Sequence, residues 1–296
     1  MFFKREKPKK GLVILEKEAG LARLTLNRPE ALNSLNEEMV KELDAAVEEA
    51  IRDSFIGAAI IMGTGRAFCA GVDLLVMASF DIGRIMEFVE FGKRILGKIE
   101  HSDKPFVAAI NGLAIGGGNE LAVACHGRVA SDDLRLGQPE LRLGMIPFWG
   151  STQRLPRLVG PEATRKLVIN CDIITAKEAY GIGLVDKVVQ AKELAKEAAN
   201  MANNLKSSGL EDIKQRKFAS RVETEFWKAF ESKDESDKAP VALREALSVI
   251  NKSSETDLDS GLLYETKAAR RCFSTQDYQE AIKAFIEKRR PKFVGA

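Results

Sequence analysis

The sequence contains very little histidine, and its few cysteines are widely separated. His101 and His126 are the only two histidines among 296 residues, which leaves little material for a histidine-rich metal site or a Ser-His-Asp triad. The cysteines show no C-x-x-C spacing and lie in mostly apolar surroundings: Cys69, Cys125, Cys171 and Cys272. This pattern favours buried free thiols in a reducing compartment over disulfides or zinc. We therefore expect a cytoplasmic protein without a metal site.

The chain also lacks a charge imbalance and a long apolar run. Lys and Arg number 45 and Asp and Glu 43, so the net charge of +2 is too balanced to indicate nucleic acid or a membrane surface as the main partner. No segment reaches the apolar length of a membrane span, and the basic residues 1–10 lack the apolar core of a signal peptide. A hydrophobic content of 45% with 30% charged residues is typical of a soluble globular protein with a sizeable core.

A glycine-rich stretch near the middle of the chain carries the strongest signal for chemistry. An apolar run at 105–110 leads into an Asn-Gly turn at 111–112, then three glycines at 116–118, then Glu120 at the start of a helical pattern. Amides at a helix start lack intrahelical partners and can bind an anion. Glu140 offers a second carboxylate after another tight turn. Taken alone, the stretch fits either an acid–base site or a glycine-rich turn followed by two solvated glutamates.

Strand and helix patterns alternate up to about residue 190, which predicts an α/β fold. The expected elements include a hairpin at 11–26, a helix capped by Asn36, a strand at 58–62, a helix at 85–99 and a helix with a capping box at Thr175 and Glu178. Residues 191–296 show helical patterns, with a highly charged section at 206–238 that predicts a solvated helix or insert. We therefore predict a core at 11–200 and a helical region at 201–296.

Seven motifs in collinear order resemble the crotonase, or enoyl-CoA hydratase/isomerase, superfamily over residues 11–295. They are NRPEALNSL, GRAFCAGVDL, KPFVAAINGLAIGGGNELAVAC, LGQPELRLGMIP, STQRLPRLVG, TAKEAYGIGLVDKVV and AFIEKRRPKF. The resemblance implies the crotonase (ClpP-like) fold, a spiral of ββα repeats with a C-terminal helical region that packs trimers, which commonly pair into hexamers. It also implies a coenzyme A thioester as ligand and no cofactor besides the coenzyme A of the substrate.

By motif position, the resemblance assigns roles to four residues. The backbone N–H groups of Val72 and Gly117 would hold the thioester oxygen, where negative charge develops during enolate-type chemistry. Glu120 and Glu140 match the two glutamates with which family hydratases hold a water and move protons. Family isomerases generally use one glutamate at the later position, so the pair favours an enoyl-CoA hydratase.

Contacts to coenzyme A and to the acyl group are implied for a further set of residues. These are Arg66, Ala70, Asp73, Gly116, Phe148, Phe285 and Lys288. Lys288 would offer a point charge to a phosphate, although the end of an amphipathic helix with a solvated basic face fits the same pattern. Phe148 and Trp149 stand where the family usually has small residues, so they either narrow the acyl pocket or fold away as core.

Other functions fit the same resemblance. A family isomerase, or a hydrolase that cleaves a thioester or opens a ring, would use the same pair of amides. A non-catalytic or RNA-binding member would show a basic stripe and dispensable glutamates, whereas the chain has only a small basic tail at 4–10. A Rossmann-type dinucleotide site is disfavoured because GGGNE lacks the G-x-G-x-x-G spacing.

Overall fold

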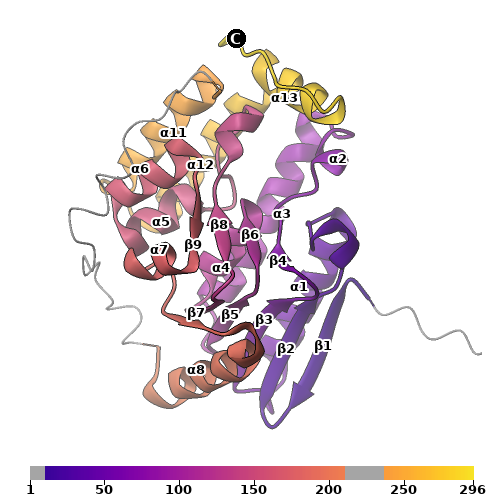
Figure 1. Cartoon of the computed structure of the whole chain (residues 1–296), viewed down its shortest axis with the longest axis vertical. Helices are drawn as coiled ribbons and strands as arrows, with labels where there is room; N and C mark the ends of the chain where they lie inside the picture. The colour runs from indigo at the N-terminus through magenta and orange to yellow at the C-terminus, as the bar shows by residue number, and fades with distance from the viewer. Residues whose placement is uncertain (1–10, 211–236) are drawn as a thin grey trace, which may run out of the picture.

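The computed structural model describes residues 11–210 and 237–296. The basic tail at 4–10 and most of the charged section predicted at 206–238 lie outside these residues. Figure 1 shows a core of strands and helices, with the C-terminal helices gathered at one end of the molecule and the N-terminal hairpin at the other.

The main layer is a six-stranded sheet. In spatial order its strands are β1 (Val13–Glu18), β2 (Leu21–Leu26), β3 (Ala58–Gly63), β5 (Phe106–Ile110), β7 (Gly127–Ser131) and β10 (Lys187–Val189). The pair β1–β2 is antiparallel and turns at Ala19 and Gly20, which both have positive φ, so the predicted hairpin is confirmed. All other pairs are parallel, and β5 and β7 are buried throughout, as is typical of a parallel sheet covered on both faces.

A second, four-stranded sheet lies beside the first. Its strands are β4 (Ala67–Cys69), β6 (Leu113–Ile115), β8 (Arg135–Gly137) and β9 (Ile173–Thr175). Strands β4, β6 and β8 follow β3, β5 and β7 directly in the chain, and each pair of strands leads into a helix. This repetition is the expected ββα spiral. The three-residue strands of this sheet are too short for their periodicity to reveal them in the sequence.

Helices connect the repeats. They are α1 (Glu37–Arg52), α2 (Leu74–Met77), α3 (Ile82–Glu100), α4 (Gly117–Ala124), α5 (Ser151–Val159), α6 (Pro161–Asn170) and α7 (Ala176–Gly181), with short 3-10 helices η1 (Pro29–Ala31), η2 (Glu140–Leu143) and η3 (Ala191–Glu193). Asn36 caps α1 by accepting from the Met39 amide at 2.9 Å, as predicted. The capping box of Thr175 and Glu178 at the start of α7 is also confirmed.

Helix α8 (Leu194–Ser208) packs across one face of the main sheet, against β3, β5 and β7 (Figure 1). Its buried residues, among them Ala202 and Leu205, form a separate apolar cluster with Ile60 of β3, Val107 of β5 and Val129 of β7. The predicted boundary at residue 200 therefore falls within this helix. Helix α8 ends at Ser208, and the division of the chain into a core and a helical region stays a prediction.

The C-terminal region consists of α11 (Pro240–Lys252), α12 (Leu258–Phe273) and α13 (Gln276–Ile286). Helices α11 and α12 pack against α5 and the neighbouring α6 and α3, and α13 packs against η2. A row of edge-to-face rings joins this region to the core. The centroid of the Phe273 ring lies 5.5 Å from that of Phe148 and 5.1 Å from that of Tyr278. A helical C-terminal region is thus confirmed for the described residues. Its role in packing trimers stays a prediction.

The packing of α8 predicts that Leu205→Ala destabilises the whole core. Removing a buried leucine side chain from the α8–sheet cluster should lower the free energy of unfolding by about 2–4 kcal/mol. Chemical denaturation measures this change, and the exposed Asn204→Ala on the same helix serves as the matched control. Equal stabilities of the two variants would contradict the assignment of α8 to the core.

Candidate active site

Two loops approach each other closely, one after β4 and one after β6. Gly71, in the first loop, has a φ of +94°, and a Cβ there would lie 2.8 Å from the carbonyl oxygen of Ile115 in the second. A Cβ on Gly118 would overlap the backbone of Cys69. Glycine at these two positions is what allows the two backbones to meet.

The approach brings two backbone amides to one cavity. The Leu35 amide donates to the Gly71 carbonyl oxygen at 2.8 Å, and the Asp73 amide donates to the Leu35 carbonyl oxygen at 3.1 Å. This parallel bridge leaves the intervening Val72 amide pointing away from Leu35. Gly117 is the first residue of α4, so its amide has no intrahelical acceptor. In residues 11–210 and 237–296, neither the Val72 nor the Gly117 amide has a hydrogen-bond acceptor.

The cavity is small, with a volume of about 70 Å³. Its walls come from the loops after β4 and β6, from η2 and from the segment before α5, and they consist of Ala70, Gly71, Val72, Leu74, Met77, Ile115, Gly116, Gly117, Pro139, Glu140, Leu143, Met145 and Phe148. The structure thus brings together six of the residues predicted from the sequence, namely Ala70, Val72, Gly116, Gly117, Glu140 and Phe148. That they bind a thioester stays a prediction.

Four other predicted residues lie outside the walls of this cavity. Arg66 is exposed in the turn between β3 and β4. Asp73 caps α2 and forms an ion pair with Arg28 at 2.7 Å, so its carboxylate already has partners. Phe285 is 46% exposed near the end of α13, and Lys288 follows that helix on the surface. Contacts of these residues with coenzyme A stay predictions.

Glu120 projects from α4 into the interior and is only 1% exposed. Its Oε1 accepts from the Trp149 amide at 2.8 Å and from the Ser151 amide at 3.0 Å, at the start of α5. Its Oε2 has no hydrogen-bond partner within the described part of the chain. Burial, and then the negative charge of Glu265, raise the pKa of Glu120 to about 7, while the two amides and Arg154 act in the opposite direction.

Glu140 begins η2 and is 5% exposed. The neighbouring groups orient the Gln138 amide so that its nitrogen donates to Glu140 at 2.8 and 3.2 Å, while its oxygen accepts from Asn119 Nδ2 at 3.1 Å and from Ser151 Oγ at 2.6 Å. The opposite orientation would point the amide oxygen at a carboxylate. Burial, and then the charge of Glu120, raise the pKa of Glu140 well above its ordinary value.

The two carboxyl groups therefore titrate as a pair. Ser151 joins them, because its amide donates to Glu120 and its hydroxyl donates to the Gln138 amide that holds Glu140. Two buried carboxyl groups that repel each other's charge favour the state with one proton between them near neutral pH. Such a pair contains one group that accepts a proton and one that donates, as acid–base catalysis requires.

Neither a cap of α4 at Glu120 nor a solvated loop carboxylate at Glu140 is found in the structure. Glu120 does not cap its own helix, because α4 begins at Gly116 without a side-chain cap and the carboxyl group binds amides of α5 instead. Glu140 is not a solvated loop carboxylate, because it is buried.

Phe148 and Trp149 have different roles. Phe148 lines the cavity and packs edge-on against Phe273 of α12. Trp149 turns toward α3, where its ring fills the space left by the missing side chain of Gly92 and lies 5.5 Å from Phe88. Phe148 therefore narrows the cavity, and Trp149 is mainly core.

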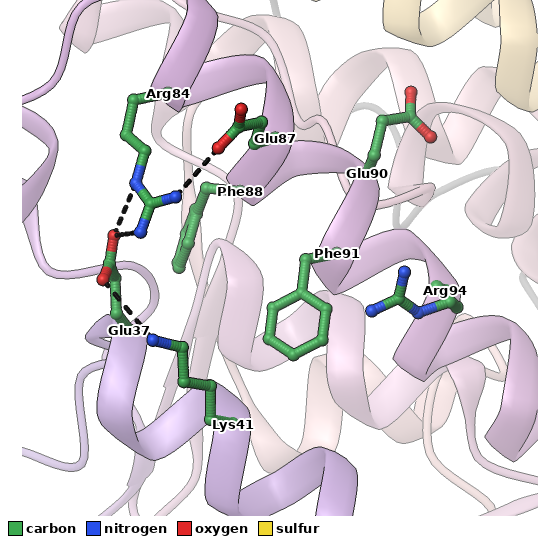
Figure 2. A pocket seen from close by; sticks show the side chains of 8 residues that line it. All are labelled: Glu37, Lys41, Arg84, Glu87, Phe88, Glu90, Phe91 and Arg94. Atoms are coloured by element: carbon green, nitrogen blue, oxygen red, sulfur yellow. Dashed lines mark hydrogen bonds and ion pairs between the residues drawn. The ribbon is translucent and has the colours of Figure 1, made fainter.

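A larger groove of about 450 Å³ lies on the surface between α1 and α3. Figure 2 shows Phe88 and Phe91 between charged side chains, with Arg84 bonded to both Glu37 and Glu87. These charges neutralise one another, and neither Glu120 nor Glu140 reaches the groove. Its size therefore does not make it the site of the chemistry.

The four cysteines are buried and free in the structure. Burial raises the pKa of each thiol to about 12, so none of them is a thiolate nucleophile at neutral pH. Across the described residues, no three His, Cys, Asp or Glu side chains gather in a way that could hold a metal ion. No described helix has both the length and the apolar character needed to cross a membrane.

Sequence reasoning missed three residues of this site: Gln138, Ser151 and Glu265. Gln138 was identifiable, because it precedes Pro139 and Glu140 in the same motif. Glu265 gave a weaker signal, since it falls on the buried face of α12 between Gly261 and Ala268. Ser151 gave none, because its contribution to Glu120 is a backbone amide.

Known proteins resemble the chain over nearly its whole length. A family model described as Enoyl-CoA hydratase/isomerase matches residues 16–233. A protein of Syntrophomonas wolfei named crotonyl-CoA hydratase is 38% identical over 284 residues, which are 96% of this chain and 98% of the relative. A Clostridium acetobutylicum protein named short-chain-enoyl-CoA hydratase is 39% identical over 279 residues, 94% of this chain and 95% of the relative. The crystal structure of an enoyl-CoA hydratase from Bacillus anthracis aligns with a TM-score of 0.64 at 30% identity, over 96% of this chain and 100% of that one.

The raised pKa of Glu120 predicts a pH-dependent effect of Glu120→Gln on stability. A carboxyl group whose pKa rises on folding binds its proton more tightly in the folded state, so stability falls as the pH rises from 4.5 to about 7. Glutamine carries no charge at either pH. The free energy of unfolding of the variant should therefore be close to that of the wild type near pH 5 and exceed it by up to about 3 kcal/mol near pH 8.

Chemical denaturation at both pH values tests this, with Glu90→Gln on the exposed face of α3 as the control. A stability difference between Glu120→Gln and the wild type that stays the same at both pH values would contradict the assigned burial of charge.

Proposed function

The chain belongs to the enoyl-CoA hydratase/isomerase family, and we propose that it is an enoyl-CoA hydratase, which adds water reversibly to a 2-enoyl-CoA to give a 3-hydroxyacyl-CoA. The observation that carries this proposal is the pair of buried carboxyl groups, Glu120 and Glu140, of which Glu140 lines the same cavity as Val72 and Gly117. Addition of water to an activated double bond needs both a proton acceptor and a proton donor, and the pair supplies them.

The amides of Val72 and Gly117 would hold the thioester carbonyl oxygen. Negative charge moves onto this oxygen when water attacks the double bond and an enolate forms. Because both donors are fixed in the backbone, they stabilise that charge without having to reorient. The loss of one such donor typically raises the barrier by about 3–4 kcal/mol.

The two glutamates would move the protons. The member of the pair that is a carboxylate accepts a proton from water as the water oxygen bonds to Cβ of the acyl group. The member that is a carboxylic acid then delivers its proton to Cα, which converts the enolate into the 3-hydroxyacyl product. The pair ends with one proton, as it began, and dehydration runs through the same steps in reverse.

The acyl group would be short. The cavity holds about 70 Å³, and Phe148, packed against Phe273, closes one side of it. Two of the most similar relatives carry names that specify crotonyl-CoA or short-chain substrates. We assign the contacts with coenzyme A to Arg66, Asp73 and Lys288 and to the apolar Ala70 and Phe285.

We propose no cofactor beyond the coenzyme A of the substrate, because the reaction needs only acid–base groups and hydrogen-bond donors. We also propose a homotrimer or a hexamer made of two trimers. The half-exposed Phe285 and the exposed Ile286 at the end of α13 support a contact between subunits there. The four free cysteines support a cytoplasmic location.

Hydration of crotonyl-CoA by the purified protein tests the proposal. Loss of the enoyl absorbance, together with a mass increase of one water, should accompany turnover. Glu120→Gln and Glu140→Gln should each lower kcat by about 10²–10⁴-fold, because each removes one partner in proton transfer. Glu90→Gln, on the exposed face of α3, should match the wild type.

A shifted double bond would instead indicate an isomerase, and free coenzyme A a hydrolase. Inertness toward all of these thioesters, with the glutamates dispensable, would favour a binding protein.

The position of Phe148 predicts a change of chain-length preference. Phe148→Ala should raise the ratio of kcat/KM for a longer 2-enoyl-CoA to that for crotonyl-CoA, because it removes one wall of the cavity. Phe91→Ala is the matched control, since Phe91 lines the surface groove between α1 and α3 and not the cavity. An unchanged ratio in Phe148→Ala would show that another residue limits the acyl length.

A further inference from the structure

A buried ion pair lies close to Glu120. It joins Lys93 of α3 to Glu265 of α12, with Lys93 Nζ 3.0 Å from Glu265 Oε1. Glu265 is 0% exposed, and the Lys93 side chain is almost fully buried. Burying two charges is costly, and such pairs contribute little net stability compared with apolar residues of the same shape. Their position beside the proposed catalytic glutamate gives them a different use.

Among the described residues, the polar partners of Lys93 Nζ all come from α12. Its Nζ donates to the Leu262 carbonyl oxygen at 2.7 Å and to Thr266 Oγ1 at 2.6 Å, in addition to its pairing with Glu265. The ammonium group thus has three partners one turn apart on a single helix. This geometry fixes the positive charge of Lys93 beside the carboxylate of Glu265.

Glu265 and Glu120 bind consecutive amides. The Ser151 amide donates to Glu120 Oε1 at 3.0 Å. The next amide along the chain, that of Thr152, donates to Glu265 Oε2 at 3.2 Å, and the Thr152 hydroxyl donates to the same oxygen at 2.6 Å. The first turn of α5 therefore lies between two carboxyl groups, and Glu265 fixes the turn that positions Glu120.

Several charged groups face Glu120 from the elements around it. The negative charge of Glu265, on α12, opposes ionisation of Glu120. The negative charge of Glu120 in turn opposes ionisation of Glu140, on η2. Arg154 of α5 favours ionisation, but it is also bonded to Glu100 of α3, at 2.9 and 3.1 Å. The thiol of Cys69 on β4, which packs beside α4, stays neutral.

We propose that Lys93 and Glu265 are positioning residues for the hydration reaction, which hold the start of α5 against Glu120 and place the negative charge of Glu265 beside its carboxyl group. This inference rests on the proposed function, because it assigns a purpose to the proton on Glu120. Glu265 acts through its negative charge and through Thr152. Lys93 acts by keeping that charge in place.

Infrared spectroscopy tests the inference without relying on turnover. The carboxylic acid C=O stretch of Glu120 is followed against pH in a Glu140→Gln background, which removes the coupled partner, and the band is assigned by its loss in Glu120→Gln. Adding Glu265→Gln removes a negative charge and leaves Lys93 bonded to α12. The midpoint of the titration should then fall by about one pH unit or more.

The double change Lys93→Met with Glu265→Gln removes both charges, so it should lower the midpoint less than Glu265→Gln alone. It also avoids leaving a buried charge unpaired, which can prevent folding. Glu245→Gln is the matched control, since Glu245 is also buried on a C-terminal helix and pairs with Arg271 at 2.5 Å, away from Glu120. This control should leave the midpoint unchanged.

The pH dependence of kcat/KM gives a second readout. With Glu140 intact, the limb that reports the glutamate pair should move to lower pH in Glu265→Gln. A lower kcat with an unmoved limb and an unmoved infrared midpoint would show that Glu265 only supports the fold, and it would overturn the inference. A shifted infrared midpoint without hydration of any thioester would instead support the effect of the Glu265 charge on Glu120 and refute the proposed function.

Discussion

The first turn of helix α5 is the feature on which the site depends. Its amides, at Ser151 and Thr152, bind the carboxyl groups of Glu120 and Glu265, and the Ser151 hydroxyl reaches Glu140 through Gln138. A helix start is suited to this because its amides lack partners within the helix. The C-terminal helices are consequently part of the site, since Glu265 comes from one of them.

Burying these carboxyl groups acts against stability, and the surroundings show how the fold tolerates it. Glu120 accepts hydrogen bonds from two amides. Lys93 and Glu265 each have a hydrogen-bond partner besides one another, the Leu262 carbonyl oxygen for Lys93 and the Thr152 hydroxyl for Glu265. Glycines after β4 and β6 let two backbones meet where side chains would clash, which brings Val72 and Gly117 together in the wall of the cavity. A protein that sacrifices stability at such positions commonly does so for function.

Much of the fold could be predicted from the sequence, since the hairpin, the Asn36 cap and the long helices each carry a local signal. The second sheet could not, because three-residue strands show no periodicity. The packing of α8 on the main sheet was not predicted either, because apolar spacing shows that a helix has a buried face but not which element covers it. Glycines and motif order indicated Glu120 and Glu140, whereas Lys93 and Glu265 meet only through tertiary packing.

In the proposed reaction, fixed backbone amides polarise a thioester carbonyl beside a carboxyl pair that shares a proton. The most direct measurement is the Raman or infrared stretch of a ¹³C-labelled thioester carbonyl in a bound, unreactive acyl-CoA. Two hydrogen bonds from Val72 and Gly117 should lower its frequency clearly below that of the same thioester in water. A frequency equal to that in water, with the ligand bound, would contradict the proposed role of the two amides, because no donors would then be acting on the oxygen.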